Sequence, residues 1–347
     1  MTKIDSTQHE AVISTIELGL HWPTLDPFLF CAHHRDDYPP GSLAMGVEPE
    51  MLTGRQMGSD FQVKDGFRMY HGTGVPGFPK HPHRGFETIT LARHGWIDHS
   101  DSMGARARFG GGDVQWMTAG RGVVHCEMFP LVNRTERNPA ELFQIWLNLP
   151  AKNKMTSPYF TMFWADQVPV VAFTDHRGRQ TEVLTIVGAL GVEPPNPPPD
   201  SWASDANNRI QVWRVAMKPG AEWVLPRTRM GDGRVLYVYE SDGIEIAGRS
   251  VEGGTGVQLN PSVDVQLRNG SGASEMLLLG GRPIGEPVAQ HGPFVMNNRS
   301  ELQQAFVDYQ QTGFGGWPWP TDDPVHGAAE GRFAVHADGR TERPDQK

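Results

Sequence analysis

The chain has 347 residues, with 40 acidic and 31 basic side chains and a formal net charge of −9. This acidic balance argues against broad binding to nucleic acids or to anionic membranes, because both require a basic surface. The two cysteines, Cys31 and Cys126, give no disulfide framework, and no stretch approaches the ~20 apolar residues of a membrane span, so we expect a cytoplasmic protein.

Short strands joined by turns are expected through the first half of the chain. Glycine (40) and proline (28) are plentiful, which favours turn-rich β folds. A first strand is expected at 11–18, and residues 31–70 are interpreted as a loop-rich insertion. Between residues 81 and 149 the pattern predicts strands at 86–93, 96–99, 114–117, 123–128 and 141–148. This spacing indicates an all-β barrel or jelly roll.

The second half of the chain repeats the pattern of the first. Strands are expected at 181–188, 209–217, 235–240, 243–247, 256–259, 263–267 and 275–281. We therefore interpret the two halves as two barrels of one kind. The proline-rich run 193–199 lies inside this half and is expected to be an exposed loop with polyproline character rather than a linker between domains.

One helix is predicted at 298–310, close to the C-terminus. Asn298 can cap its first turn, and Glu301, three residues later, completes a capping box. From Leu302 onward, apolar residues fall on one face of this helix, which should pack on a barrel. Residues 321–347 are polar with scattered glycine and proline, and we expect them to form a disordered tail.

Two short motifs carry metal-binding chemistry: His81 with His83, and His125 with Glu127. Side chains of a strand alternate between its two faces, so each pair projects to one side. If the two strands adjoin, three imidazoles and one carboxylate converge. This set suits one mononuclear divalent metal, with iron preferred and nickel, copper, manganese, cobalt or zinc as alternatives. The competing interpretation is two half-exposed histidines on an edge strand.

Two residues close to these motifs are weaker candidates for a part in the metal site. Cys126 lies between His125 and Glu127, so alternation turns it away from the metal. It is interpreted as a packed thiol, with redox sensing as the alternative. Glu87 follows His83 in phase, and it is expected either to orient a histidine from the second coordination sphere or to be a surface residue.

Four runs of the sequence resemble the pirin family of the cupin superfamily. They are 81–88 (HPHRGFET), 112–128 (GDVQWMTAGRGVVHCEM), 147–155 (LNLPAKNKM) and 286–297 (EPVAQHGPFVMN). The resemblance extends roughly from residue 20 to residue 316. It implies two tandem cupin domains, a metal-binding one at 1–155 and a second one at 156–320. The second half has neither motif, so we expect it to bind no metal.

The resemblance also implies roles for the motif residues. His81, His83, His125 and Glu127 stand at the positions of the pirin metal ligands. Glu127 is the candidate base, with Glu87 as the second choice. Some pirins are similar to quercetin 2,3-dioxygenases, which open a flavonol heterocycle with dioxygen and release carbon monoxide. The expected partners are then a small aromatic substrate and O2. Two alternatives remain: an iron-dependent regulator that binds protein partners without turnover, and a metal-stabilised structural protein.

Overall fold

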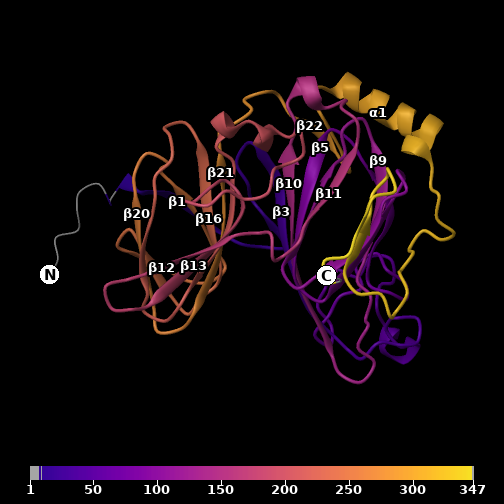
Figure 1. Cartoon of the computed structure of the whole chain (residues 1–347), viewed down its shortest axis with the longest axis horizontal. Helices are drawn as coiled ribbons and strands as arrows, with labels where there is room; N and C mark the ends of the chain where they lie inside the picture. Colours follow the sequence, from indigo (N-terminus) through magenta and orange to yellow (C-terminus); the bar gives the residue numbers. More distant parts are fainter. Residues whose placement is uncertain (1–7, 9, 346–347) are drawn as a thin grey trace. The chain divides into compact units, whose positions relative to one another are not determined.

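The computed structural model describes residues 8 and 10–345, and most of the ordered elements are strands (Figure 1). The chain forms two compact units. The first unit comprises the described residues up to 32 together with 166–285, and the second comprises 33–165 together with 286–345. Both are built from antiparallel sheets, which confirms the all-β fold with two barrels. Within the described residues, no helix has the length and apolar character needed to cross a membrane.

The first unit contains a seven-stranded and a four-stranded sheet. The larger has the order β1 (Val12–Glu17), β19 (Thr255–Leu259), β16 (Gly233–Glu240), β21 (Ser274–Gly281), β14 (Gln211–Met217), β13 (Gln180–Val187) and β12 (Val170–Thr174). The smaller has the order β15 (Glu222–Leu225), β20 (Val265–Asn269), β17 (Ile244–Ile246) and β18 (Arg249–Val251). Buried side chains of both sheets, among them Trp213, Leu236 and Leu267, form one apolar core.

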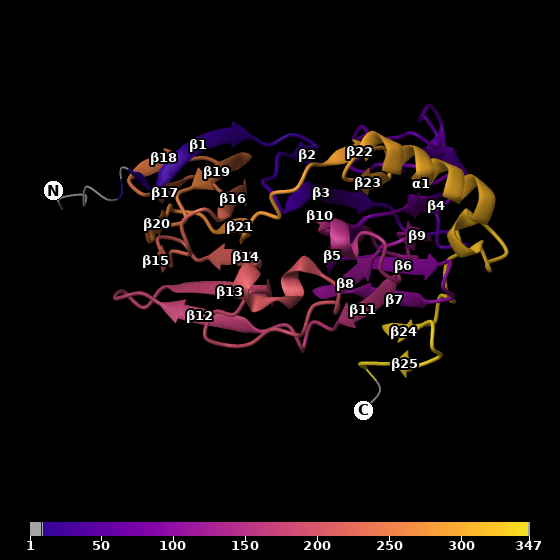
Figure 2. The same ribbon diagram turned by 90° about the horizontal axis from the view of Figure 1, so that it is seen from above.

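The second unit is organised around two six-stranded sheets. One has the order β11 (Tyr159–Phe163), β8 (Asp113–Thr118), β5 (Phe86–His94), β10 (Asn138–Asn148), β3 (Phe28–Tyr38) and β2 (His21–Trp22). The residues of β2 and the first residues of β3 are counted with the first unit, and the chain enters the second unit within β3. The other has the order β25 (Thr341–Glu342), β24 (Phe333–Val335), β7 (Arg106–Gly110), β6 (Trp96–Asp101), β9 (Val123–Met128) and β4 (Gly77–His83). Figure 2 shows the succession β4, β9, β6, β7 and β24.

Smaller elements complete the second unit. A hairpin of β22 (Ala289–His291) and β23 (Phe294–Met296) precedes helix α1 (Arg299–Thr312). The region 31–70 is only partly loop, because β3 extends through its first residues. Short 3-10 helices lie at Pro49–Leu52, Ala151–Asn153, Trp202–Ser204, Ala206–Asn208 and Gly313–Gly315.

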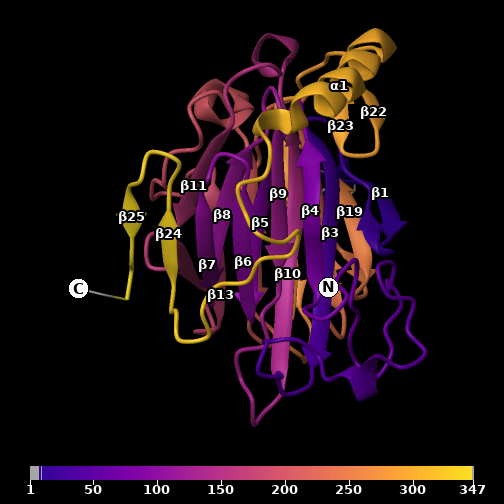
Figure 3. The same ribbon diagram turned by 90° about the vertical axis from the view of Figure 1, so that its right-hand side faces the viewer.

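Helix α1 begins as its sequence predicts. The Asn298 side-chain oxygen accepts a hydrogen bond from the backbone N–H of Glu301 at 3.0 Å. The Glu301 carboxylate reaches back to the N–H of Asn297 at 2.9 Å, one residue before the one that a regular capping box would use. The helix ends at Gly313, whose φ of 54° suits glycine. Its buried face joins an apolar cluster with Val124 of β9, and Figure 3 shows α1 across the end of the β4–β9 pair.

The structure divides the chain differently from the expected domains 1–155 and 156–320. Strand β1 pairs with β19, in register from Ser14 opposite Gln258 to Glu17 opposite Thr255. Strand β1 therefore belongs to the barrel made by residues 166–285, and α1 belongs to the other barrel. Pairing between strands more than 200 residues apart leaves no local pattern in the sequence. The domain boundaries expected from the sequence therefore differ from those of the structure.

The region expected to be a disordered tail, 321–347, is ordered up to residue 345, and residues 346–347 lie outside the described part. Strand β24 pairs with β7 (Figure 3). The buried guanidinium of Arg108 explains this order. It pairs with Asp98 at 2.7 Å and donates to the carbonyls of His326, Gly327 and Glu330. A buried cation needs its donors satisfied, so the acceptor carbonyls hold this segment on the sheet.

Candidate metal centre

Three histidines converge inside the second unit because β4 and β9 are antiparallel neighbours. His81 lies directly opposite His125 in the register, after a bulge between Phe78 and His81. The ring centroids of His81 and His125 are 4.4 Å apart, those of His83 and His125 4.9 Å, and those of His81 and His83 4.8 Å. One nitrogen from each ring lies within 4.8 Å of the others. Among the described residues, no other group of three or more His, Cys, Asp or Glu side chains has such geometry.

The nitrogens of this triad are available as electron-pair donors. The Nδ1–H of His81 donates to the carbonyl of Pro79 at 2.8 Å, so Nε2 carries the lone pair. Neither ring nitrogen of His125 has a hydrogen-bond partner in the described structure, nor has Nδ1 of His83. Burial lowers the pKa of His81 to about 4 and those of His83 and His125 well below their usual value. All three imidazoles are therefore neutral at neutral pH.

These features fit a bound metal. Burying an unpaired polar group costs about 1–3 kcal/mol, so this arrangement would be unfavourable without a ligand for the nitrogens. Neutral imidazole is the form that binds metals. His81 is only partly buried, whereas His83 and His125 are 4% and 0% exposed. His81 is therefore the most exposed member of the triad.

Glu127 lies two residues beyond His125 on the same face of β9. Side chains of β5 and β10, two strands of the other six-stranded sheet, hold its carboxylate in place. Oε1 accepts a hydrogen bond from the Thr90 hydroxyl of β5 at 3.1 Å, and Oε2 accepts one from the Gln144 amide of β10 at 2.8 Å. Burial raises the pKa of Glu127, and its neighbours His99, Thr90 and Gln144 partly offset that effect. The carboxylate is thus oriented next to the triad, although it is not one of the three clustered groups.

Other polar side chains face the same interior. The Thr88 hydroxyl and both polar atoms of the Gln115 side chain are buried and have no partner in the described structure. His99 of β6 lies opposite Glu127. Its Nε2 contacts Asp101 at 3.2 Å, and its Nδ1 has no partner. Because buried polar groups are normally satisfied, these atoms indicate an interior suited to water or to polar groups of a ligand.

Sequence reasoning missed the side chains of β5 and β10 that hold Glu127. The polar side chains of β6 make different contacts. Asp98 pairs with Arg108. Asp101 accepts from the backbone N–H groups of Met103 and Ala105 and also contacts His99, whose ring centroid lies 5.5 Å from that of His125. The signal that could have found Thr90 is strand alternation counted from Phe86, whose ring contacts His83.

The structure corrects the expectation that Glu87 stands in phase with the histidines. Strand β4 ends at His83, and β5 begins at Phe86. At the break, Gly85 has a φ of 86°, and a Cβ there would lie 1.9 Å from the carbonyl oxygen of Val295. Glu87 accepts a hydrogen bond from the Thr118 hydroxyl at 2.7 Å. Alternation along β5 therefore places it on the face opposite Thr90, away from the triad.

Cys126 lies on the other face of β9, as alternation predicts. It packs in an apolar cluster with Val75 and Met128 and is fully buried. Burial raises the pKa of its thiol, so the reactive thiolate is disfavoured.

Cys126→Ala should therefore leave the metal content per chain unchanged, because the thiol does not face the triad. The lost packing should cost on the order of 1 kcal/mol of unfolding free energy. Elemental analysis and thermal denaturation of the purified variant measure both effects. A large loss of metal in a folded variant would show that the face assigned to Cys126 is wrong.

A family model described as Pirin matches residues 21–147, which contain all four motif residues. The chain belongs to the pirin family. A second model, the pirin C-terminal cupin domain, matches residues 212–315. The family and the pair of cupin domains inferred from the sequence are therefore confirmed.

Relatives of this pirin include proteins from several bacteria and eukaryotes. The chain is 40% identical over 240 residues to a pirin-like protein of Caulobacter vibrioides, covering 69% of this chain and 80% of the relative. It is 37% identical over 251 residues to a Pseudomonas aeruginosa protein named as a candidate quercetin 2,3-dioxygenase, covering 68% and 79%. The crystal structure of quercetin 2,3-dioxygenase from Acinetobacter baumannii has a TM-score of 0.66 at 24% identity, covering 88% of this chain and 98% of that one. This last likeness shows the fold.

Proposed function

We propose that this pirin is a metal-dependent dioxygenase that opens a flavonol-type aromatic substrate with O2. The observation that carries the proposal is the triad of neutral, buried imidazoles, two of which have nitrogens without hydrogen-bond partners, beside an oriented carboxylate. The name of the P. aeruginosa relative supports the substrate class.

His81, His83 and His125 would hold the metal, with Glu127 as a further ligand or as a base. Iron is the expected metal, and nickel, copper, manganese, cobalt and zinc suit the same donors. When bound, the metal supplies a Lewis acid that lowers the pKa of a substrate hydroxyl, together with redox chemistry toward O2.

Glu127 accepts the proton of the flavonol 3-hydroxyl on one of its carboxylate oxygens. Burial raises the pKa of this carboxyl group, which makes the carboxylate a stronger base. Hydrogen bonds from Thr90 and Gln144 fix its orientation. The deprotonated flavonol is electron-rich and reacts with O2. One O2 is consumed, and one CO is released, for each heterocycle opened.

The test compares quercetin with luteolin, which lacks only the 3-hydroxyl group. Oxygen uptake, carbon monoxide release and metal content are measured on one purified sample. We expect uptake with quercetin, equimolar carbon monoxide and no uptake with luteolin, because only quercetin offers the proton that Glu127 takes. One metal per chain without uptake on quercetin would overturn the proposal and favour a regulator that binds protein partners.

A further inference from the structure

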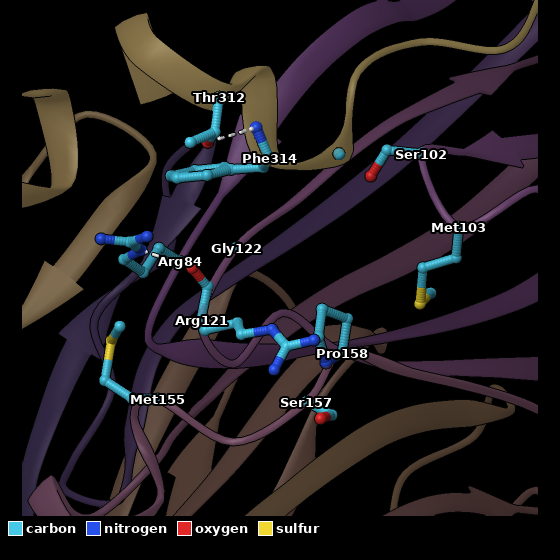
Figure 4. A pocket seen from close by; sticks show the side chains of 11 residues that line it. Arg84, Ser102, Met103, Arg121, Gly122, Met155, Ser157, Pro158, Thr312 and Phe314 are labelled. Atoms are coloured by element: carbon cyan, nitrogen blue, oxygen red, sulfur yellow. Dashed lines mark hydrogen bonds between the residues drawn. The ribbon is translucent and has the colours of Figure 1, made fainter. Parts of the chain in front are cut away.

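A cavity of about 460 Å³ lies in the second unit, apart from the triad (Figure 4). Its walls come from loops next to the metal-site strands: Arg84 after β4, Met103 after β6, Arg121 before β9, and Phe314 after α1. Its volume falls within the roughly 300–1,000 Å³ that is typical of small-molecule sites. Residue Met103 packs on Met117, Ala119 and Val123, so an apolar layer forms the boundary of the cavity toward the barrel.

The lining carries positive charge only. No acidic residue lines the cavity, although the chain as a whole has a net charge of −9. Arg84 is neutralised, because its Nη1 pairs with Asp308 at 2.6 Å, and its Nε donates to the carbonyl of Arg121 at 2.6 Å. The Arg121 guanidinium, in contrast, has no ion pair or hydrogen bond with any described residue. The residue is exposed, so the guanidinium is available to pair with the carboxylate of a bound ligand.

The remaining walls are largely apolar. Met103, Met155, Pro158 and the Phe314 ring line the space, and Figure 4 shows the Arg121 side chain extending toward Pro158. The Arg84 guanidinium lies 4.5 Å from the centroid of the Phe314 ring. Flexible methionines beside an aromatic ring form a surface suited to planar apolar groups.

The Phe314 side of the cavity has a strained backbone. Phe314 has φ 47° and ψ 48°, a left-handed conformation that is rare for a bulky residue. Its ring packs on Gly122, where an added Cβ would lie 2.5 Å from the ring. The Phe314 N–H donates to the Thr312 hydroxyl at 3.1 Å (Figure 4). Such strain persists where surrounding contacts hold it, and it is frequent at ligand sites.

We propose that this cavity binds a small aromatic carboxylate, at a site separate from the metal centre. The carboxylate accepts two parallel N–H···O hydrogen bonds from the Arg121 guanidinium, and the ring lies among Met103, Pro158 and Phe314. A planar fork of donors matches a carboxylate better than a single point charge would. The site does not depend on the activity proposed above.

The experiment measures binding of 2-naphthoate to the metal-loaded protein by calorimetry, with 2-naphthamide as the neutral analogue. We expect 2-naphthoate to bind at least about tenfold more tightly than the amide, because a charge-assisted bidentate pair is lost in the amide. Arg121→Gln should weaken 2-naphthoate binding by at least about tenfold and remove the preference for it. Ser157→Trp, which fills the cavity from an exposed lining position, should abolish binding of both compounds.

Two controls separate this site from the triad. Arg134→Gln removes an exposed arginine that does not line the cavity, and it should leave affinity unchanged. His125→Ala removes a triad member and should also leave affinity unchanged. No detectable binding, equal affinity in Arg121→Gln, or loss of binding in folded His125→Ala would each overturn the proposal.

Discussion

His125→Ala should reduce the metal content from about one per chain to near background. His125 is central to the triad, because its ring centroid lies 4.4 Å from that of His81 and 4.9 Å from that of His83. Its removal leaves two nitrogen donors where three converge. Metal added to the wild-type protein should raise the melting temperature, because a ligand at 100 times its Kd stabilises the folded state by about 2.7 kcal/mol. The variant should gain no such stabilisation. Elemental analysis and thermal denaturation with and without metal provide the readouts.

The matched control is His176→Ala, which removes an exposed histidine whose ring contacts Arg177 and which lies in the other unit. It should retain the wild-type metal content. Circular dichroism of both variants without metal shows whether they are folded. A folded His125→Ala protein that keeps one metal per chain would remove His125 from the ligand set.

Glu127→Gln should keep the metal and lower turnover of quercetin by roughly 100-fold or more, if Glu127 is the base. The amide has nearly the same size and can still accept from Gln144 through its oxygen, so the local geometry is preserved. It cannot take the substrate proton. The measurement is kcat under saturating oxygen, together with metal content.

The matched control is Glu87→Gln, which makes the same chemical change at a second buried carboxylate. Glu87 faces away from the triad and accepts a hydrogen bond from the Thr118 hydroxyl. Its turnover should stay within a few-fold of the wild-type value. Unchanged turnover in Glu127→Gln would refute the role of base. Loss of metal in that variant, with metal kept in Glu87→Gln, would instead identify Glu127 as a ligand.

The triad was predictable because its chemistry is local. Two motifs with a period of two give the face of each side chain, and only the adjacency of β4 and β9 had to be assumed. The position of Glu87 was not predictable by the same rule, because the strand breaks at Gly85. Glycine after a short polar run is the one local hint of that break.

The support of Glu127 was not visible in the sequence. Thr90 and Gln144 come from two other strands, and their approach depends on the register between β5 and β10. The same reason explains the misplaced domain boundaries, since β1 pairs with a strand more than 200 residues away. Residues 321–345 look polar and weakly patterned, yet the buried charge of Arg108 orders part of them through backbone carbonyls. Such carbonyl acceptors leave no trace in side-chain composition.

The nested arrangement of the two units has a consequence for synthesis on the ribosome. A nascent chain that has emerged up to residue 285 already contains every strand of the first unit. The second unit then still lacks α1 and the strands β22 to β25. The barrel without the histidine triad can therefore fold first during translation. The triad-bearing barrel receives the helix that covers Val124 and the strand that pairs with β7 only when the last part of the chain emerges.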